Sequence, residues 1–134
     1  MALIGLRLIH PHELPQHLGR RTETMGAIEV MRAVTAALRP VDRATRLGGG
    51  DLLLTLPSVA RDEAVALAGR IQGEIADLRR RHAFVPDTTS VVLVTRDRPL
   101  PLDRVRVGLD WAQQHRVPVA AFDGDDRLVA AALR

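Results

Sequence analysis

The amino-acid sequence predicts an α/β (α+β) domain in which helices cover a mixed sheet of about five strands. Short apolar runs of strand length alternate with longer amphipathic segments, in the order strand, helix, β-hairpin, helix, strand, helix, strand. Three consecutive glycines, Gly48 to Gly50, separate the two strand-like pieces of the hairpin and can adopt the positive φ angles of a tight turn. The length of 134 residues and the 46% hydrophobic composition suit one compact domain, so residues 1–134 are expected to form a single domain.

The first half of the chain carries the first strand, the first helix and the hairpin. ALIGLRLI (2–9) is an apolar run of strand length, and the two prolines of HPHELP limit any helix there to a turn. Apolar residues recur near helical spacing over 22–38, and Arg39-Pro40 ends this helix. RATRL and LLLTLP flank the glycines and complete the hairpin.

The second half alternates helices with buried strands. Residues 61–81 form an amphipathic pattern of several turns with a charged end, which predicts the second helix. The remaining segments are the strand TSVVLVT, the helix PLDRVRVGLDWAQQH, the strand VPVAAF and the tight turn DGD leading into RLVAAAL.

Composition narrows the classes of partner. All 19 basic residues are arginines, yet Asp and Glu are interspersed, the net charge is only +3 and aromatics are 2%, so a nucleic-acid partner is not expected. No apolar run is long enough for a membrane span and no signal peptide is recognisable, which predicts a cytoplasmic protein without a membrane partner. The absence of cysteine excludes disulfides and thiolate metal sites. The guanidinium groups of arginine suit small anionic ligands, because each can donate two parallel hydrogen bonds to a phosphate.

The stretch LRPVDRATRLGGGDLLLTLP (38–57), followed by ARDEAVALAGRI (60–71), resembles the GGDEF domains of the diguanylate cyclase family. The signature hairpin of that family reads Arg, any residue, Gly-Gly-Asp/Glu-Glu-Phe, and a hydrophobic strand ending in Leu-Pro follows. The match extends roughly over residues 4–123 and implies a palm-like mixed sheet with helices on both faces.

The resemblance also implies that the catalytic machinery is degenerate. A cyclase that joins two GTP molecules needs carboxylates to hold two divalent ions. The family's metal-binding acids fall on Arg7 and Gly50, and its guanine-reading Asn and Asp fall on Pro15 and Thr24, leaving Asp51 as one surviving acid beside Gly48 and Gly49. The family's phosphate-binding lysines fall near His12 and Ala112, and Arg116 remains as one phosphate contact. We therefore expect no catalysis, no metal and no cofactor.

One ligand site of the family resembles an intact one. Many of its cyclases carry an inhibitory site for their product, cyclic di-GMP, marked by Arg-x-x-Asp ending five residues before the Gly-Gly. Arg39-Pro40-Val41-Asp42 stands at that position, and the match places Arg70 as the second arginine of the site. Arginine can grip guanine N7 and O6, aspartate can accept from guanine N1 and N2, and both arginines can face phosphates. The sequence thus predicts a cyclic di-GMP receptor that forms a homodimer or a ligand-bridged dimer.

Alternatives stay open. Arg39 at a helix C-terminus and Asp42 in a turn are also ordinary structural residues, which leaves a pseudo-enzyme that works as a dimerisation or protein-docking module without nucleotide. His10, His12 and Glu13 are possible metal ligands but lack a second cluster, so no metal site is predicted. Two further features are interpreted structurally: Trp111 as a core residue and Arg79 to His82 as a solvated helix end.

Overall fold

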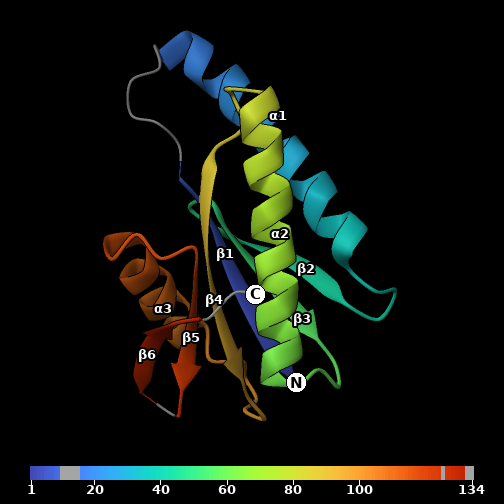
Figure 1. Ribbon diagram of the computed structural model, residues 1–134, viewed down its shortest axis with the longest axis vertical. Helices are drawn as coiled ribbons and strands as arrows, with labels where there is room; N and C mark the ends of the chain where they lie inside the picture. Colours follow the sequence, from blue (N-terminus) through green and yellow to red (C-terminus); the bar gives the residue numbers. More distant parts are fainter. Residues whose placement is uncertain (10–15, 125, 132–134) are drawn as a thin grey trace.

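The computed structural model describes residues 1–9, 16–124 and 126–131 (Figure 1). The strands are β1 (Ala2–Ile9), β2 (Arg43–Gly48), β3 (Asp51–Leu56), β4 (Asp87–Val94), β5 (Val119–Asp123) and β6 (Arg127–Ala130). The helices are α1 (Gln16–Ala37), α2 (Arg61–Arg81) and α3 (Leu102–Gln114).

The strands form one mixed sheet in the order β2-β3-β1-β4-β5-β6. Strands β4 and β5 are parallel, and the other neighbouring pairs are antiparallel. The sheet has six strands where about five were predicted, because the segment after the DGD turn folds back and pairs with β5. The predicted fold class is confirmed.

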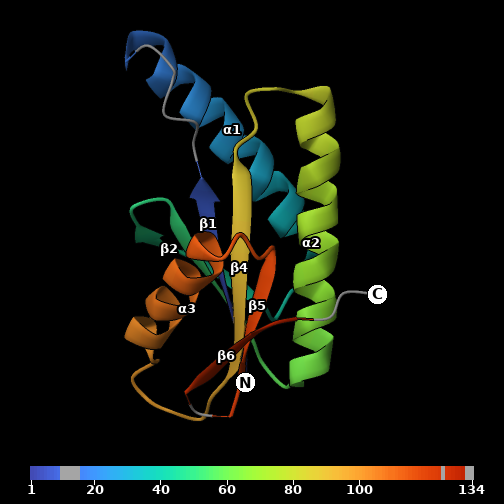
Figure 2. The ribbon, with the colours of Figure 1, turned by 60° about the vertical axis from the view of Figure 1, so that its left-hand side comes forward.

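Helices cover both faces of the sheet, as Figure 2 shows, with α1 and α2 on one face and α3 on the other. The alternation of side chains along β1 explains this layering. Ile4 and Leu6 belong to the core under α1 and α2, whereas Leu3 belongs to the core under α3. Helix α1 begins at Gln16, six residues before the predicted 22, because proline disfavours helix interiors and Gln16 follows the last proline of HPHELP.

Two glycines let α3 approach the sheet closely. A Cβ atom at Gly108 would lie 2.4 Å from Cγ2 of Val91, and one at Gly5 would lie 2.6 Å from Cγ1 of Val105. Neither distance is possible for a real side chain, so both positions require glycine for this packing. The close approach brings the carboxyl half of α3 over the end of β1.

Candidate ligand site at the 39–43 turn

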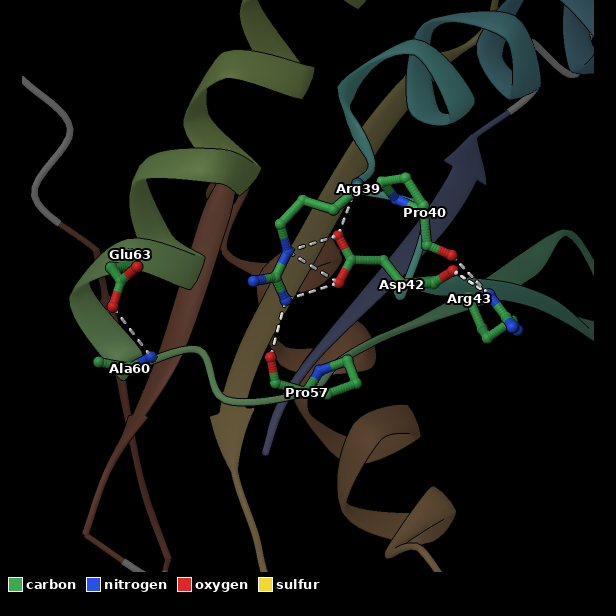
Figure 3. A network of polar contacts seen from close by, with 7 residues as sticks. All are labelled: Arg39, Pro40, Asp42, Arg43, Pro57, Ala60 and Glu63. Atoms are coloured by element: carbon green, nitrogen blue, oxygen red, sulfur yellow. Dashed lines mark hydrogen bonds and ion pairs between the residues drawn. The ribbon is translucent and has the colours of Figure 1, made fainter.

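The Arg39-Pro40-Val41-Asp42 motif forms the turn between α1 and β2 (Figure 3). The amide N–H of Asp42 donates to the carbonyl of Arg39 at 3.0 Å, and the amide N–H of Arg39 donates to Oδ2 of Asp42 at 2.7 Å. The Asp42 side chain therefore closes the turn on itself, as aspartate commonly does in turns. The i, i+3 spacing of the motif makes this closure possible.

The Arg39 guanidinium binds the same carboxylate. Nε lies 3.2 Å from both carboxylate oxygens of Asp42, and Nη2 lies 2.8 Å from Oδ1 and 2.7 Å from the carbonyl oxygen of Pro57. The hydrogen bonds from Arg39 hold the pKa of Asp42 below its ordinary value and raise the pKa of Arg39. The Asp42 side chain is 2% exposed and that of Arg39 is 48% exposed, so the arginine faces solvent and the aspartate does not.

A count of donors shows what Arg39 can still bind. A guanidinium carries five N–H donors. Asp42 and Pro57 engage Nε and Nη2, while Nη1 has no bond to any residue that the structure describes. The turn therefore presents the Nη1 amino group of a fixed arginine to solvent. Asp42, which the sequence predicts to accept from guanine, is buried in this structure and holds Arg39.

Arg70, the second arginine of the predicted site, is an exposed residue of α2. The first turn of α2 lies near the 39–43 turn, because Arg39 donates to the carbonyl of Pro57 and the amide of Ala60, three residues later, donates to Glu63 (Figure 3). Arg70 is seven residues after Glu63, which is the same helix face about 10 Å further along the axis. Its side chain is exposed and makes no ion pair or hydrogen bond with the residues described.

The glycine hairpin has the conformation that the sequence predicts. Gly48, Gly49 and Gly50 have φ angles of 86°, 63° and 85°, and the β2–β3 register shifts between Arg46 and Gly48. A cavity of about 380 Å³ lies between the glycines and α1, with Thr24 among its lining residues. Apolar side chains of α1, including Ile28 and Met31, form much of its wall.

Arg7, which the resemblance to GGDEF domains places where that family has a metal-binding acid, lies next to this hairpin. Residues Arg7 and Asp51 face each other in the β1–β3 register. Nε and Nη2 of Arg7 donate to the two oxygens of Asp51 at 2.8 and 2.9 Å, and Nη1 contacts Asp110 at 2.5 Å and Gln113 at 3.2 Å. The hydrogen bonds with Asp51 raise the pKa of Arg7. Two carboxylates therefore converge on an internal cation.

The other residues singled out by the sequence lie in different parts of the structure. Ala112 and Arg116 line a cavity of about 620 Å³ between the ends of α2 and α3. Trp111 is half-buried against the core under α3 and stacks on His115, with 4.4 Å between ring centroids. In the Arg79 to His82 segment, Arg79 pairs with Asp87 and Arg80 with Asp77, which is the predicted charged helix end. Pro15, His10, His12 and Glu13 lie outside the described residues.

Two features are absent from the part of the chain that the structure describes. In residues 1–9, 16–124 and 126–131, no three His, Cys, Asp or Glu side chains gather in a way that would hold a metal ion. Across the same part of the chain, no helix combines the length and the apolar character that crossing a bilayer requires.

Sequence reasoning missed three groups that define these arrangements: the Pro57 carbonyl, Asp110 and Gln113. The Pro57 carbonyl is a backbone group 18 residues from Arg39, and Asp110 is 103 residues from Arg7. Only the Leu-Pro end of the hairpin strand offered a sequence signal for the first, and nothing in the sequence pointed to the other two.

Comparison with solved structures identifies the fold as that of bacterial nucleotide cyclases. No protein-family model matches the sequence, and no curated protein matches it. The chain superposes with a TM-score of 0.64 on the diguanylate cyclase SiaD from Pseudomonas aeruginosa, solved with its activator SiaC, at 17% identity over 90% of this chain. It spans 48% of the length of that SiaD chain.

Other structures with this fold include a GGDEF domain and an adenylyl cyclase. The GGDEF domain of DgcB from Caulobacter crescentus, solved with c-di-GMP, gives a TM-score of 0.64 at 16% identity, covering 90% of this chain and 76% of that one. A bacterial light-regulated adenylyl cyclase gives 0.63 at 10% identity, covering 90% and 42%. The chain thus has the palm-like fold of GGDEF domains. A fold shared with adenylyl cyclases does not by itself determine the ligand.

Proposed function

We propose that this protein is a catalytically inactive GGDEF-like domain that binds cyclic di-GMP through Arg39 and Arg70, with Asp42 holding Arg39 in place. The observation that carries the proposal is the geometry of the turn: a buried aspartate fixes an exposed arginine and leaves its Nη1 group unbound. Because Arg39 is already oriented, its side chain loses less conformational entropy when it binds a ligand phosphate.

The spacing of the two arginines supports a dinucleotide ligand. Glu63 and Arg70 share a face of α2 about 10 Å apart along the helix axis, and we take the ligand to extend from Arg39 along this face to Arg70, a span too long for one phosphate group. Cyclic di-GMP carries two phosphates and two guanine edges, all of which accept hydrogen bonds from guanidinium groups. Two such ligands stacked between two copies of the site would link two protein chains, so we expect dimerisation to follow ligand binding.

The Arg7 cluster supports the inactive part of the proposal. Cyclase chemistry needs carboxylates that are free to hold divalent ions against a triphosphate. Asp51 is already paired with both Nε and Nη2 of Arg7, and Gly50 offers no side-chain oxygen. The nearest acid on α3, Asp110, is directed at the same guanidinium. A metal ion would have to displace a tethered cation from both carboxylates.

A second candidate is a structural pseudo-enzyme that docks proteins without binding nucleotide. One observation favours it: Asp42 is buried and accepts hydrogen bonds from the backbone amide and the guanidinium of Arg39. These bonds stabilise the turn, so the motif would be retained for stability even without a ligand. This candidate predicts the same oligomeric state with and without cyclic di-GMP.

Isothermal titration calorimetry with cyclic di-GMP tests the proposal on the full chain. We expect binding of roughly micromolar strength, weakened at least about tenfold in Arg39→Ala and in Arg70→Ala. Arg81→Ala is the matched control, because Arg81 is an exposed arginine on the same helix and its loss should leave the affinity unchanged. GTP with magnesium should yield neither heat nor product.

Three results would separate the candidates. No heat with cyclic di-GMP, or equal weakening by Arg81→Ala, would contradict the proposed site. Formation of cyclic di-GMP from GTP would contradict inactivity. Sedimentation of the chain with and without ligand would show whether the oligomeric state depends on cyclic di-GMP, and a constant state would favour the pseudo-enzyme.

A further inference from the structure

The 39–43 turn borders a cavity that is separate from the two described above and lies on the side of the sheet that α3 covers. Its volume is about 320 Å³, and it is lined by Met1, Val41, Arg43, Thr55, Pro57, Arg98, Pro99 and Leu100. Met1 and Leu100 pack against the core under α3, and Thr55 shares the strand face of Leu53 in that core. Figure 3 shows the Arg39 and Arg43 side chains on either side of Asp42. Arg39 lies on the side of Asp42 that faces Glu63 of α2.

The floor of this cavity is apolar and open. Five of its lining residues are hydrophobic or proline, and Val41 at its edge is 58% exposed. An exposed valine beside an apolar hollow exposes hydrophobic surface that a partner could bury. The volume falls at the lower end of the range for ligand cavities, which suits a single inserted side chain with its flanking backbone.

The rim of the cavity carries unbalanced positive charge. Nη1 of Arg43 donates to the carbonyls of Pro40 and Asp42 at 2.9 and 3.0 Å, which fixes the guanidinium over the turn. Neither Arg43 nor Arg98 has an ion pair among the described residues, and no carboxylate lines the cavity. A partner that supplies carboxylates would therefore complement this rim.

A backbone edge lies next to the cavity. Arg43 begins β2, which is the edge strand of the sheet and pairs only with β3 in the part of the chain described. Edge strands present unpaired N–H and C=O groups to which an extended peptide can add. A nucleic acid would instead require a longer basic surface with aromatic side chains for stacking, and no aromatic residue lines this cavity.

We infer that this cavity is a docking site for an extended acidic peptide segment of a protein partner, which inserts an aliphatic side chain between Val41 and Leu100 and directs flanking carboxylates to Arg43 and Arg98. The inference rests on the cavity alone and does not require the chain to bind cyclic di-GMP.

Methyl and amide NMR of the full chain tests this inference with a defined probe. The probe is the acetylated, amidated pentapeptide Glu-Asp-Leu-Asp-Glu, and two controls replace its acids by Gln and Asn or its Leu by Ser. We expect the probe to shift the methyl signals of Met1, Val41 and Leu100 in a saturable and salt-sensitive way. Each control peptide should bind at least about threefold more weakly.

Matched variants assign the binding to the cavity. Arg98→Ala and Val41→Ser should each weaken probe binding at least about threefold. Val107→Ser is the control, because Val107 is as exposed as Val41, at 57%, but lies on α3 and does not line the cavity. Arg43 is left intact because it also holds the carbonyls of the turn.

Several outcomes would overturn the inference. One is that the probe peptide causes no methyl shifts. Another is that the uncharged control peptide causes shifts as large as those of the probe. A third is that Val107→Ser weakens probe binding as much as Val41→Ser does. Shifts of the same methyl groups on raising the protein concentration without peptide would assign the cavity to a second copy of the chain, and would overturn the inference as well.

Discussion

Arg7→Met removes the cation on which Asp51 and Asp110 converge and should destabilise the fold strongly. The Arg7 and Asp51 side chains are 16% and 7% exposed, so this ion pair is largely buried, whereas Asp110 is 70% exposed. Removing one partner of a buried pair costs about 3–5 kcal/mol, because the other charge stays buried without compensation. Loss of the ion pair with the exposed Asp110 adds at most about 1 kcal/mol to this cost.

This loss translates into a clear thermal shift. With 134 residues, the entropy of unfolding near the midpoint is about 280 cal/mol/K, so a loss of 3–5 kcal/mol lowers Tm by about 11–18 °C. Differential scanning calorimetry of the wild type and Arg7→Met measures the shift directly. Methionine keeps much of the apolar bulk of the arginine stem, so the comparison isolates the charge and its hydrogen bonds.

A double-mutant cycle tests the cause. Asp51→Asn alone should also destabilise, because Arg7 loses its main partner. In the Arg7→Met background the same change should cost much less or should stabilise, because it removes the uncompensated charge. Additive effects of the two changes, or a Tm shift below about 3 °C in Arg7→Met, would refute the assignment of this pair as a stabilising buried ion pair.

Two further predictions concern the turn and the packing of α3. Hydrogen bonds from Arg39 lower the pKa of Asp42 below its ordinary 3.8. The pair's contribution is therefore present above pH 3.8 and is lost as pH falls through the lower folded-state pKa. Urea unfolding of wild type and Asp42→Asn should differ at about pH 6, begin to converge below pH 3.8 and coincide below the folded-state pKa. Gly108→Ala should cost about 1–3 kcal/mol, because its Cβ would meet Val91 at 2.4 Å. The control Gly73→Ala, also helical but with nothing within 4 Å, should stabilise by up to about 1 kcal/mol; equal effects in calorimetry would show that α3 shifts at no cost.

The fold could be predicted because its signals are local. The apolar runs that became β1, β4 and β5 and the amphipathic spacing of α2 each require only a few neighbouring residues, and the three glycines mark the hairpin by their freedom to take positive φ. The final strand β6 was not predicted, because RLVA is short and its pairing with β5 is a tertiary choice.

The site could be predicted only in part. Arg39 and Asp42 are three residues apart, so their meeting in a turn follows from the sequence. The role of Asp42 does not follow, because whether its carboxylate faces a ligand or is buried depends on how α2 and the β3 end close over the turn. A carboxylate buried there needs a cationic partner, and Arg39 is that partner. The Arg7 cluster depends on the β1–β3 register and on α3, which no local pattern specifies.

The two arginine–aspartate pairs differ in the guanidinium N–H groups that they leave unpaired, and the proposed loss of catalysis and the proposed ligand binding both rest on this difference. Arg7 uses Nε, Nη1 and Nη2 on Asp51, Asp110 and Gln113, so an incoming phosphate would have to break existing bonds in a largely buried place. Arg39 uses Nε and Nη2 and keeps Nη1 open at the surface. Since an arginine recognises a phosphate through N–H groups that are still unpaired, we expect nucleotide phosphates to bind at the 39–43 turn and not at the Arg7 cluster. In the proposed function, one arginine–aspartate pair therefore blocks the hairpin site and the other preorganises the ligand site.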